Sequence, residues 1–269
     1  MLPYHITDIA VVQGLTEFLP VSSSGHLILV PEVLGWKDQG LEMDVAVHVG
    51  TLGAVCLYFW KDVWSLFKGL FNLVRGRTDK GAKLMLNLSI GTIPAVIFGA
   101  FLSHYGTGGM RAIAFIGWTT LGFGILLFLA DQIGRLEKGF SHVTPGRALL
   151  IGFAQAVALL PGTSRSGACL TMCRFLGFKR PDAARFSFLL SIPAIIAAAS
   201  LTAYKMLSKG QFVMGAPMLY AMVISLIVGL IAIRFMMRLM STSTMTPFVV
   251  YRIGLGGLLL AWAYWGFRF

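Results

Sequence analysis

The chain has 269 residues, of which 57% are hydrophobic and only 12% are charged. A soluble domain normally carries about 25% charged residues, so this composition excludes a soluble globular protein. On a soluble protein the net charge of +11 would suggest nucleic acid, but here the cations lie in short segments between apolar runs. We therefore expect a protein that is embedded in membrane lipid and binds no nucleic acid.

The first half of the chain opens with an apolar segment, 9–30, which Pro, Gly and serines interrupt in LPVSSSGH at 19–26. Non-helical backbone at membrane depth is tolerated only where protein or a water-filled cavity surrounds it, so we expect a re-entrant hairpin here. Three apolar runs follow, near the ~20 residues that cross the hydrocarbon core. They are 44–60, 84–103 and 112–130. The charged segment 61–83 between the first two is expected to be a loop.

The second half repeats this order. An apolar segment at 148–176 is interrupted by LPGTSRSGA at 160–168, which predicts a second re-entrant hairpin. Three more spanning runs follow it. They are 186–204, 216–233 and 248–267.

The two interrupted segments also align with each other. With an offset of 142, Gln13 aligns with Gln155 and Ser22 with Ser164. We therefore expect an all-α membrane bundle of six spanning helices plus two re-entrant helical hairpins, in repeats at roughly 1–135 and 136–269. Three spans per repeat invert the second repeat, and the broken helices of inverted repeats usually meet at a midplane ligand site.

Basic residues indicate which side of the membrane each segment faces. We assign 61–83 to the cytoplasm, and alternation then places 132–147, 174–185 and 234–247 on the same side. These four segments hold fifteen Lys and Arg, against five outside, which agrees with the positive-inside rule. The five outside are Lys37, Arg111, Lys205, Lys209 and Arg268. Both termini then lie outside, the hairpins enter from opposite sides, and their polar tips can meet.

Glu17 is an ionisable residue within the apolar part of the first hairpin. Burial of a carboxylate in a membrane costs free energy, so such a residue is expected to have a function. Gln13, one helical turn earlier, is placed to orient the carboxylate or a ligand. Ser22, Ser23, Ser24, Gly25 and His26 follow, which bring donors, a nucleophile and a base together. Helix capping is the alternative role for the serines.

The second tip supplies the cation. Arg165 presents a fork of donors that matches phosphate oxygens. Hydroxyls and backbone amides at the start of a helix form an anion site with it. The residues of both tips that we expect to bind the diphosphate with it are Gln13, Ser22, Ser24, Gly25, Thr163, Ser164, Ser166 and Gly167. A structural ion pair between Arg165 and Glu17 is the alternative.

Other polar residues receive lesser roles. Asp44 and His48 are expected near the outer mouth, with His48 a helix-packing residue. Asp131 lies at a span end, where interfacial placement accounts for it, and Arg252 is expected to snorkel to the interface. Cys169 and Cys173 are expected to be buried thiols rather than metal ligands.

The motifs QGLTEFLPVSSSGHL (13–27) and PGTSRSGA (161–168) resemble the two signatures of the bacterial undecaprenyl-diphosphate phosphatase family, also called the bacitracin-resistance protein family. The resemblance runs over essentially the whole chain. It implies a multi-pass protein of the bacterial plasma (inner) membrane that hydrolyses undecaprenyl diphosphate, recycles the lipid carrier for cell-wall synthesis and confers bacitracin resistance. The loop charges place the active site open to the outer, periplasmic side.

The resemblance also implies roles for single residues. Glu17, Ser23, His26 and Arg165 match the family's catalytic positions, whereas Gln13 stands where many members have Glu. A divalent cation, Mg²⁺ or Ca²⁺, is implied, with Glu17 as its one nearby carboxylate.

The sequence leaves three questions open. The nucleophile is Ser23, His26 or water, and the motifs do not decide between a monomer and a homodimer. The alternative function is transport of a polyprenyl phosphate through the same cleft, because inverted repeats with broken helices are transporter architecture.

Overall fold

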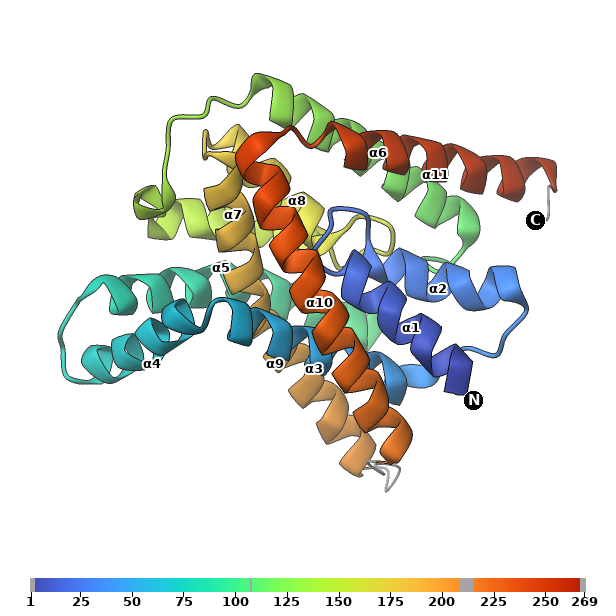
Figure 1. Ribbon diagram of the computed structural model, residues 1–269, viewed down its shortest axis with the longest axis horizontal. Coiled ribbons are helices and arrows are strands. Elements are labelled where there is room, and N and C mark those ends of the chain that lie inside the picture. The colour runs from blue at the N-terminus through green and yellow to red at the C-terminus, as the bar shows by residue number, and fades with distance from the viewer. Residues whose placement is uncertain (1–2, 107, 209–214, 267–269) are drawn as a thin grey trace.

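The computed structural model describes residues 3–106, 108–208 and 215–266, and within these ranges it contains eleven α-helices (Figure 1). They are α1 (Pro3–Thr16), α2 (Ser23–Leu34), α3 (Gly40–Tyr58), α4 (Trp60–Val74), α5 (Lys80–Tyr105), α6 (Ile113–Ile133), α7 (Pro145–Val157), α8 (Arg165–Phe175), α9 (Arg180–Ser208), α10 (Ala216–Thr242) and α11 (Thr246–Trp265). The predicted all-α class is confirmed.

Six of the described helices are long and apolar enough to cross a membrane: α3, α5, α6, α9, α10 and α11. They coincide with the six predicted runs, which confirms a multi-pass membrane protein. Some extend further than their apolar runs, since α9 begins at Arg180 and α10 continues to Thr242. Charged side chains reach the headgroup region from helix ends, so a helix need not stop where its apolar run stops. Residue 267 of the last run, Lys209 and Arg268 lie outside the described residues.

The two interrupted segments form pairs of short helices, α1 with α2 and α7 with α8. These helices have 11 to 14 residues each. At 1.5 Å per residue they are roughly 17–21 Å long, too short to cross a hydrocarbon core about 30 Å thick. Each pair therefore has the dimensions of the predicted hairpin, which turns back within the bundle.

The segment 61–83 is not the loop that we predicted, because most of it forms α4. One face of α4 packs on α5 through the buried Leu66 and Gly69. The opposite face exposes Trp60, Trp64 and Phe67 among its lysines. Aromatic and basic residues on one amphipathic helix are typical of a helix that lies in the membrane interface. Charged residues interrupt the apolar residues of α4 along the chain, so this segment contains no continuous apolar run.

The spanning helices pack in pairs around the hairpins. α6 and α11 run side by side along one edge, and α3, α9 and α10 contact one another at another (Figure 1). α5 packs on α7 so closely that a Cβ at Gly152 would collide with the backbone of Gly91. Small residues that let helix backbones approach are the usual means of packing in a membrane.

Asp131 is buried rather than interfacial. It is 3% exposed and accepts hydrogen bonds from Arg174 Nε at 3.1 Å and from Arg180 Nε at 2.7 Å. Arg174 also donates to backbone carbonyls, including that of Asp131 at 3.1 Å. The ends of α6 and α8 leave such carbonyls without helical partners, which explains why a buried arginine is needed there.

Candidate active site

The turns at the two hairpin tips share one backbone conformation. Ser22 and Ser164 have φ angles of 76° and 72°, in the left-handed region that residues other than glycine rarely adopt. Each serine caps the helix that follows. Ser22 Oγ accepts from the Gly25 amide at 3.3 Å, and Ser164 Oγ accepts from the Gly167 amide at 3.1 Å. Capping, which we named as the alternative role for the serines of the first tip, is therefore observed at Ser22, and Ser164 caps α8 in the same way.

The tips lie against each other in the middle of the bundle (Figure 1). Ser166 Oγ of the second tip donates to the Leu19 carbonyl of the first at 3.0 Å. The predicted meeting of the two motifs is thus observed. The division of the whole chain into repeats at 1–135 and 136–269 stays a prediction.

Glu17 is the centre of the polar contacts between the tips. Its side chain is 5% exposed, and Oε1 accepts from Arg165 Nη2 at 2.9 Å. Oε2 accepts from Ser23 Oγ at 2.6 Å and from Gln13 Nε2 at 2.9 Å. Three donors converge on one carboxylate, so Glu17 is held as a hydrogen-bond acceptor that faces a serine hydroxyl.

Arg165 begins α8 and connects the second tip to Glu17. Its side chain is 16% exposed. Nη1 donates to the Ser187 carbonyl at 3.2 Å, whereas the buried Nε has no hydrogen-bond partner among the described residues. The ion pair with Glu17, which we named as the structural alternative, is present. It leaves a guanidinium donor free and both residues on a cavity wall, which a purely structural pair would not require.

A cavity of about 340 Å³ opens beside this pair. Its polar wall carries Glu17, Ser23, Ser24 and Arg165, and an apolar wall comes from α9. The remaining lining residues are Leu41, Asp44, Val45, His48, Ala158, Leu159, Ala194, Ile195, Ala198, Ala199 and Thr202. A cavity whose wall combines a cation with small aliphatic residues fits an amphiphile that has an anionic headgroup.

His48 faces this cavity, although we predicted a helix-packing role for it. Its Nδ1 lies 2.6 Å from the Asp44 carbonyl, which only a protonated Nδ1 can satisfy as a hydrogen bond. The other nitrogen, Nε2, lies 3.8 Å from Glu17 Oε2. Asp44 and His48 stand four residues apart in an apolar helix, and that spacing is the signal that would have placed both on one functional face.

The motif histidine lies elsewhere in this structure. His26 is not among the described residues that line the cavity. Its Nδ1 lies 2.7 Å from the Ser22 carbonyl, and its Nε2 lies 2.6 Å from the Tyr251 hydroxyl. Both nitrogens therefore have partners, and the contact with Tyr251 joins the first tip to α11. The catalytic role assigned to His26 stays a prediction.

The other predicted phosphate-binding residues lie behind the cavity wall. Gln13, Ser22, Ser164, Ser166 and Thr163 are all buried. Ser166 joins the two tips, Ser22 and Ser164 cap their own helices, and Gln13 donates to Glu17. The Thr163 hydroxyl has no partner among the described residues. Gly25 and Gly167 supply the amides that the capping serines bind. Contact of this group with phosphate stays a prediction, and the structure brings only Glu17, Ser23, Ser24 and Arg165 of the predicted set to the wall.

Arg252 is fully buried, so its predicted position at the membrane interface is wrong. Nη1 donates to the Pro20 carbonyl at 3.2 Å and Nη2 donates to the Gly162 carbonyl at 3.0 Å. Nε donates to the Thr120 carbonyl at 3.1 Å. Broken helices free these tip carbonyls, and their need for donors draws the arginine inward.

The residues present fit a hard divalent cation only in part. The described residues contain no group of three or more His, Cys, Asp or Glu that could form a metal cage. Glu17 is nevertheless beside Gln13, whose buried Oε1 has no partner in the described part of the chain. Mg²⁺ commonly binds through one or two protein oxygens, substrate phosphates and water. Glu17 and Gln13 fit such a shared site.

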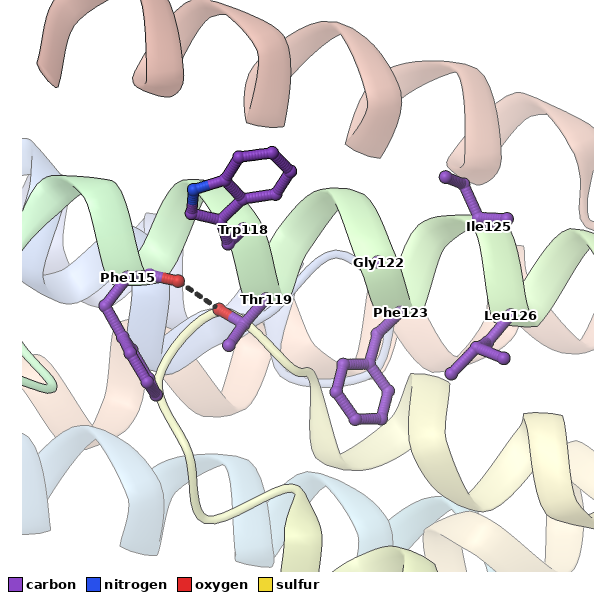
Figure 2. A pocket seen from close by; sticks show the side chains of 7 residues that line it. All are labelled: Phe115, Trp118, Thr119, Gly122, Phe123, Ile125 and Leu126. Carbon is purple, nitrogen blue, oxygen red and sulfur yellow. Dashed lines mark hydrogen bonds between the residues drawn. The ribbon is translucent and has the colours of Figure 1, made fainter. Parts of the chain in front are cut away.

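A second hollow lies on the outer face of α6 and is lined only by that helix, from Phe115 to Leu126 (Figure 2). Among the described residues that line it, Thr119 alone carries a hydroxyl, which donates to the Phe115 carbonyl at 3.0 Å and to the Pro161 carbonyl at 2.6 Å. None of its lining residues is charged. It is therefore a lipid-facing surface that supports the second tip, and it is not a candidate for phosphate chemistry.

The family model described as Bacitracin resistance protein BacA matches residues 7–258 of the chain. The chain belongs to this family. The family resemblance predicted from the two motifs is confirmed, and both hairpin tips lie inside the part of the chain that matches BacA.

Individual relatives match over nearly their full length. One, from Jannaschia sp. (strain CCS1), is 49% identical over 258 residues, which cover 95% of this chain and 97% of the relative. Another, from Roseobacter denitrificans, is 46% identical over 266 residues, which cover 98% of this chain and all of the relative. Both are called undecaprenyl-diphosphatase. A third, from Rhodospirillum rubrum, is 45% identical over 99% of this chain and 97% of its own length, and is called undecaprenyl-diphosphatase 1.

Proposed function

We propose that this protein hydrolyses undecaprenyl diphosphate to undecaprenyl phosphate and inorganic phosphate, and so recycles the lipid carrier of cell-wall synthesis. The observation that carries the proposal is the contact of Ser23, Glu17 and Arg165 on the wall of a half-apolar cavity. A nucleophile, a proton acceptor and a phosphate-binding cation meet there within a membrane protein. The names of the relatives support the same substrate. Hydrolysis of this lipid also accounts for the bacitracin resistance in the family's name.

Arg165 is the residue that we expect to bind the diphosphate. Its guanidinium can exchange the Glu17 oxygen for phosphate oxygens, and its free Nε adds a further donor. Phosphoryl transfer depends mainly on positioning and charge stabilisation, which a buried guanidinium supplies. The helix starts at Ser23 and Arg165 add backbone amides that favour an anion.

Ser23 is the nucleophile that the geometry supports. Its hydroxyl already donates to Glu17 at 2.6 Å and lines the cavity, whereas His26 is bonded outside it. Ser23 Oγ attacks the terminal phosphorus, the bond from phosphorus to the bridging oxygen breaks, and undecaprenyl phosphate leaves. Glu17 takes the serine proton. Water then attacks the phosphorus of the phosphoserine, and the bond from phosphorus to Ser23 Oγ breaks. Glu17 returns its proton to Ser23 Oγ, and the hydrogens of water leave with inorganic phosphate.

A divalent cation, Mg²⁺ or Ca²⁺, held by Glu17 and Gln13 together with diphosphate oxygens and water, would neutralise phosphate charge. The need for it follows from charge balance. The substrate brings several negative charges next to the buried Glu17, and Arg165 supplies only one positive charge to the pair.

We also propose that the cavity opens to the outer side of the plasma membrane and that both termini lie outside. The lining residues Leu41, Asp44 and His48 come from the first half of α3, and Ala198 and Thr202 come from the second half of α9. These helix ends lie opposite the segments rich in Lys and Arg, which mark the cytoplasmic side.

Phosphate release from undecaprenyl diphosphate by the detergent-purified protein tests the function, with Mg²⁺ and with EDTA. We expect release that requires the cation and is lost in Ser23→Ala but retained in Ser241→Ala, an exposed serine at the end of α10. Absence of release from folded wild-type protein would contradict the proposal. Reconstitution in vesicles would then show whether the lipid phosphate is moved across the bilayer, which is the transport alternative.

A further inference from the structure

Arg252 connects the two hairpins at matching positions of their turns. Pro20 lies two residues before Ser22, and Gly162 lies two residues before Ser164, the two serines that share a left-handed backbone. One guanidinium therefore donates through its two terminal nitrogens to equivalent carbonyls of both tips, at 3.2 and 3.0 Å.

The same side chain also fixes the tips to the rest of the bundle. Its Nε donates to the Thr120 carbonyl of α6, and Thr120 Oγ1 donates at 3.3 Å to the Gly162 carbonyl that Arg252 also binds. Added Cβ atoms at Gly124 and Gly167 would each lie 3.0 Å from Arg252 atoms. The adjacent helices α6 and α8 therefore have glycine at the two positions where the Arg252 side chain passes them.

Burial of the Arg252 guanidinium costs energy that its hydrogen bonds to carbonyls offset only in part. Arg252 is fully buried, and no carboxylate of the described residues pairs with it within 4.0 Å. A buried charge without a counter-ion is expensive and is retained mainly where function requires it. Its two tip contacts lie three residues from the groups that we assign to catalysis, since Pro20 is midway between Glu17 and Ser23, and Gly162 precedes Arg165 by three.

We infer that Arg252 is a positioning residue that holds the two hairpin tips in register, so that Ser23 and Glu17 of one tip face Arg165 of the other. It does not line the cavity and touches no reacting group. It acts through the backbone carbonyls of Pro20 and Gly162. The kinetic part of this inference rests on the proposed phosphatase function, whereas the structural part does not.

The test compares Arg252→Lys and Arg252→Ala with a matched control, Arg174→Lys. Arg174 is also fully buried and also donates to several backbone carbonyls, but at the Asp131 cluster. A misplacement of about 1 Å can cost about 100-fold in rate, so we expect kcat of Arg252→Ala to fall by about 100-fold. We expect KM to change much less, because the cavity wall is intact. Lysine cannot bind two carbonyls with a planar fork, so Arg252→Lys should recover only part of the loss.

Hydrogen exchange measured by mass spectrometry gives a readout that does not depend on activity. In both Arg252 variants, exchange should rise together in the two tips, 18–24 and 160–166, and in Arg174→Lys it should rise near residues 131–138 and 174–180 instead. If wild-type protein released no phosphate, the proposed function would fail while the exchange pattern would still test the positioning.

Two results would overturn the inference. One is a folded Arg252 variant whose kcat stays within about threefold of wild type, a change no larger than ordinary context effects. The other is exchange that rises in only one tip or uniformly through the bundle. If Arg252→Ala cannot be purified as a folded protein, Arg252→Lys tests the inference by the same two criteria.

Discussion

Substitution of Glu17 by glutamine should separate substrate binding from catalysis. The change keeps the shape of the side chain but removes the charge that accepts hydrogen bonds from Ser23, Gln13 and Arg165. An amide has a single acceptor oxygen, so it cannot satisfy three donors that now converge on two carboxylate oxygens. The serine loses its proton acceptor, and Arg165 loses the anion that competes with the substrate.

The size of the effect follows from these two losses. Proton transfer by a positioned side chain typically contributes about 10²–10⁴-fold, so kcat should fall by that factor, or about 2.7–5.5 kcal/mol. With EDTA present, so that no divalent cation contributes, affinity for the diphosphate should not fall, because a negative charge next to the phosphate has been removed. The assay is phosphate release at several substrate concentrations, together with binding of a non-hydrolysable diphosphate analogue.

Glu32→Gln is the matched control, since Glu32 is exposed and lies on the same helix as Ser23. The control should retain wild-type kcat and analogue binding. Near-normal kcat in folded Glu17→Gln would refute the assignment of Glu17 as proton acceptor. Loss of analogue binding with unchanged kcat would refute it as well and would make Glu17 a binding residue.

Three further variants probe separate parts of the account. Arg165→Lys keeps the charge but not the fork, so kcat/KM should fall by about 10-fold to 150-fold, the equivalent of one charged hydrogen bond; an unchanged value would show that any cation suffices. His48→Ala removes an imidazole whose Nε2 lies 3.8 Å from Glu17 Oε2, and phosphate release should fall by about tenfold, or about 1.4 kcal/mol. Phosphate release at the wild-type rate in His48→Ala would show that His48 serves only in helix packing. Asp131→Asn leaves Arg174 without its buried partner, so it should lower stability by about 3–5 kcal/mol, seen as a lower Tm, while kcat at permissive temperature stays unchanged; a large fall in kcat would tie this cluster to the site.

The sequence predicted those features that depend on local pattern. Apolar runs of nearly 20 residues identified the six spanning helices, because few other structures in a protein need such runs. Pro, Gly and serine clusters identified the breaks at Ser22 and Ser164, because a helix cannot continue through the left-handed backbone found there. The pairing of Glu17 with Arg165, which we named as the structural alternative, rested on two opposite charges in apolar hairpins.

Features that depend on long-range contacts were not predictable in this way. Arg252 binds a carbonyl 232 residues away, and nothing near it in the sequence distinguishes a buried arginine from one that snorkels. The orientation of His26 toward Tyr251 depends on a contact across 225 residues. Helix α4 was missed for a different reason, since its apolar face is interrupted by charges along the chain and becomes continuous only on a helix.

The central claim is that the two hairpin tips act as one active site, and a double-mutant cycle of phosphate release tests it most directly. Glu17→Gln, Arg165→Gln and the double variant are compared with wild type by kcat/KM. Residues that act as a unit give strongly non-additive losses, so the double variant should be about as slow as the slower single variant. Losses that multiply in full would contradict the claim, because they would mean that Glu17 and Arg165 contribute independently.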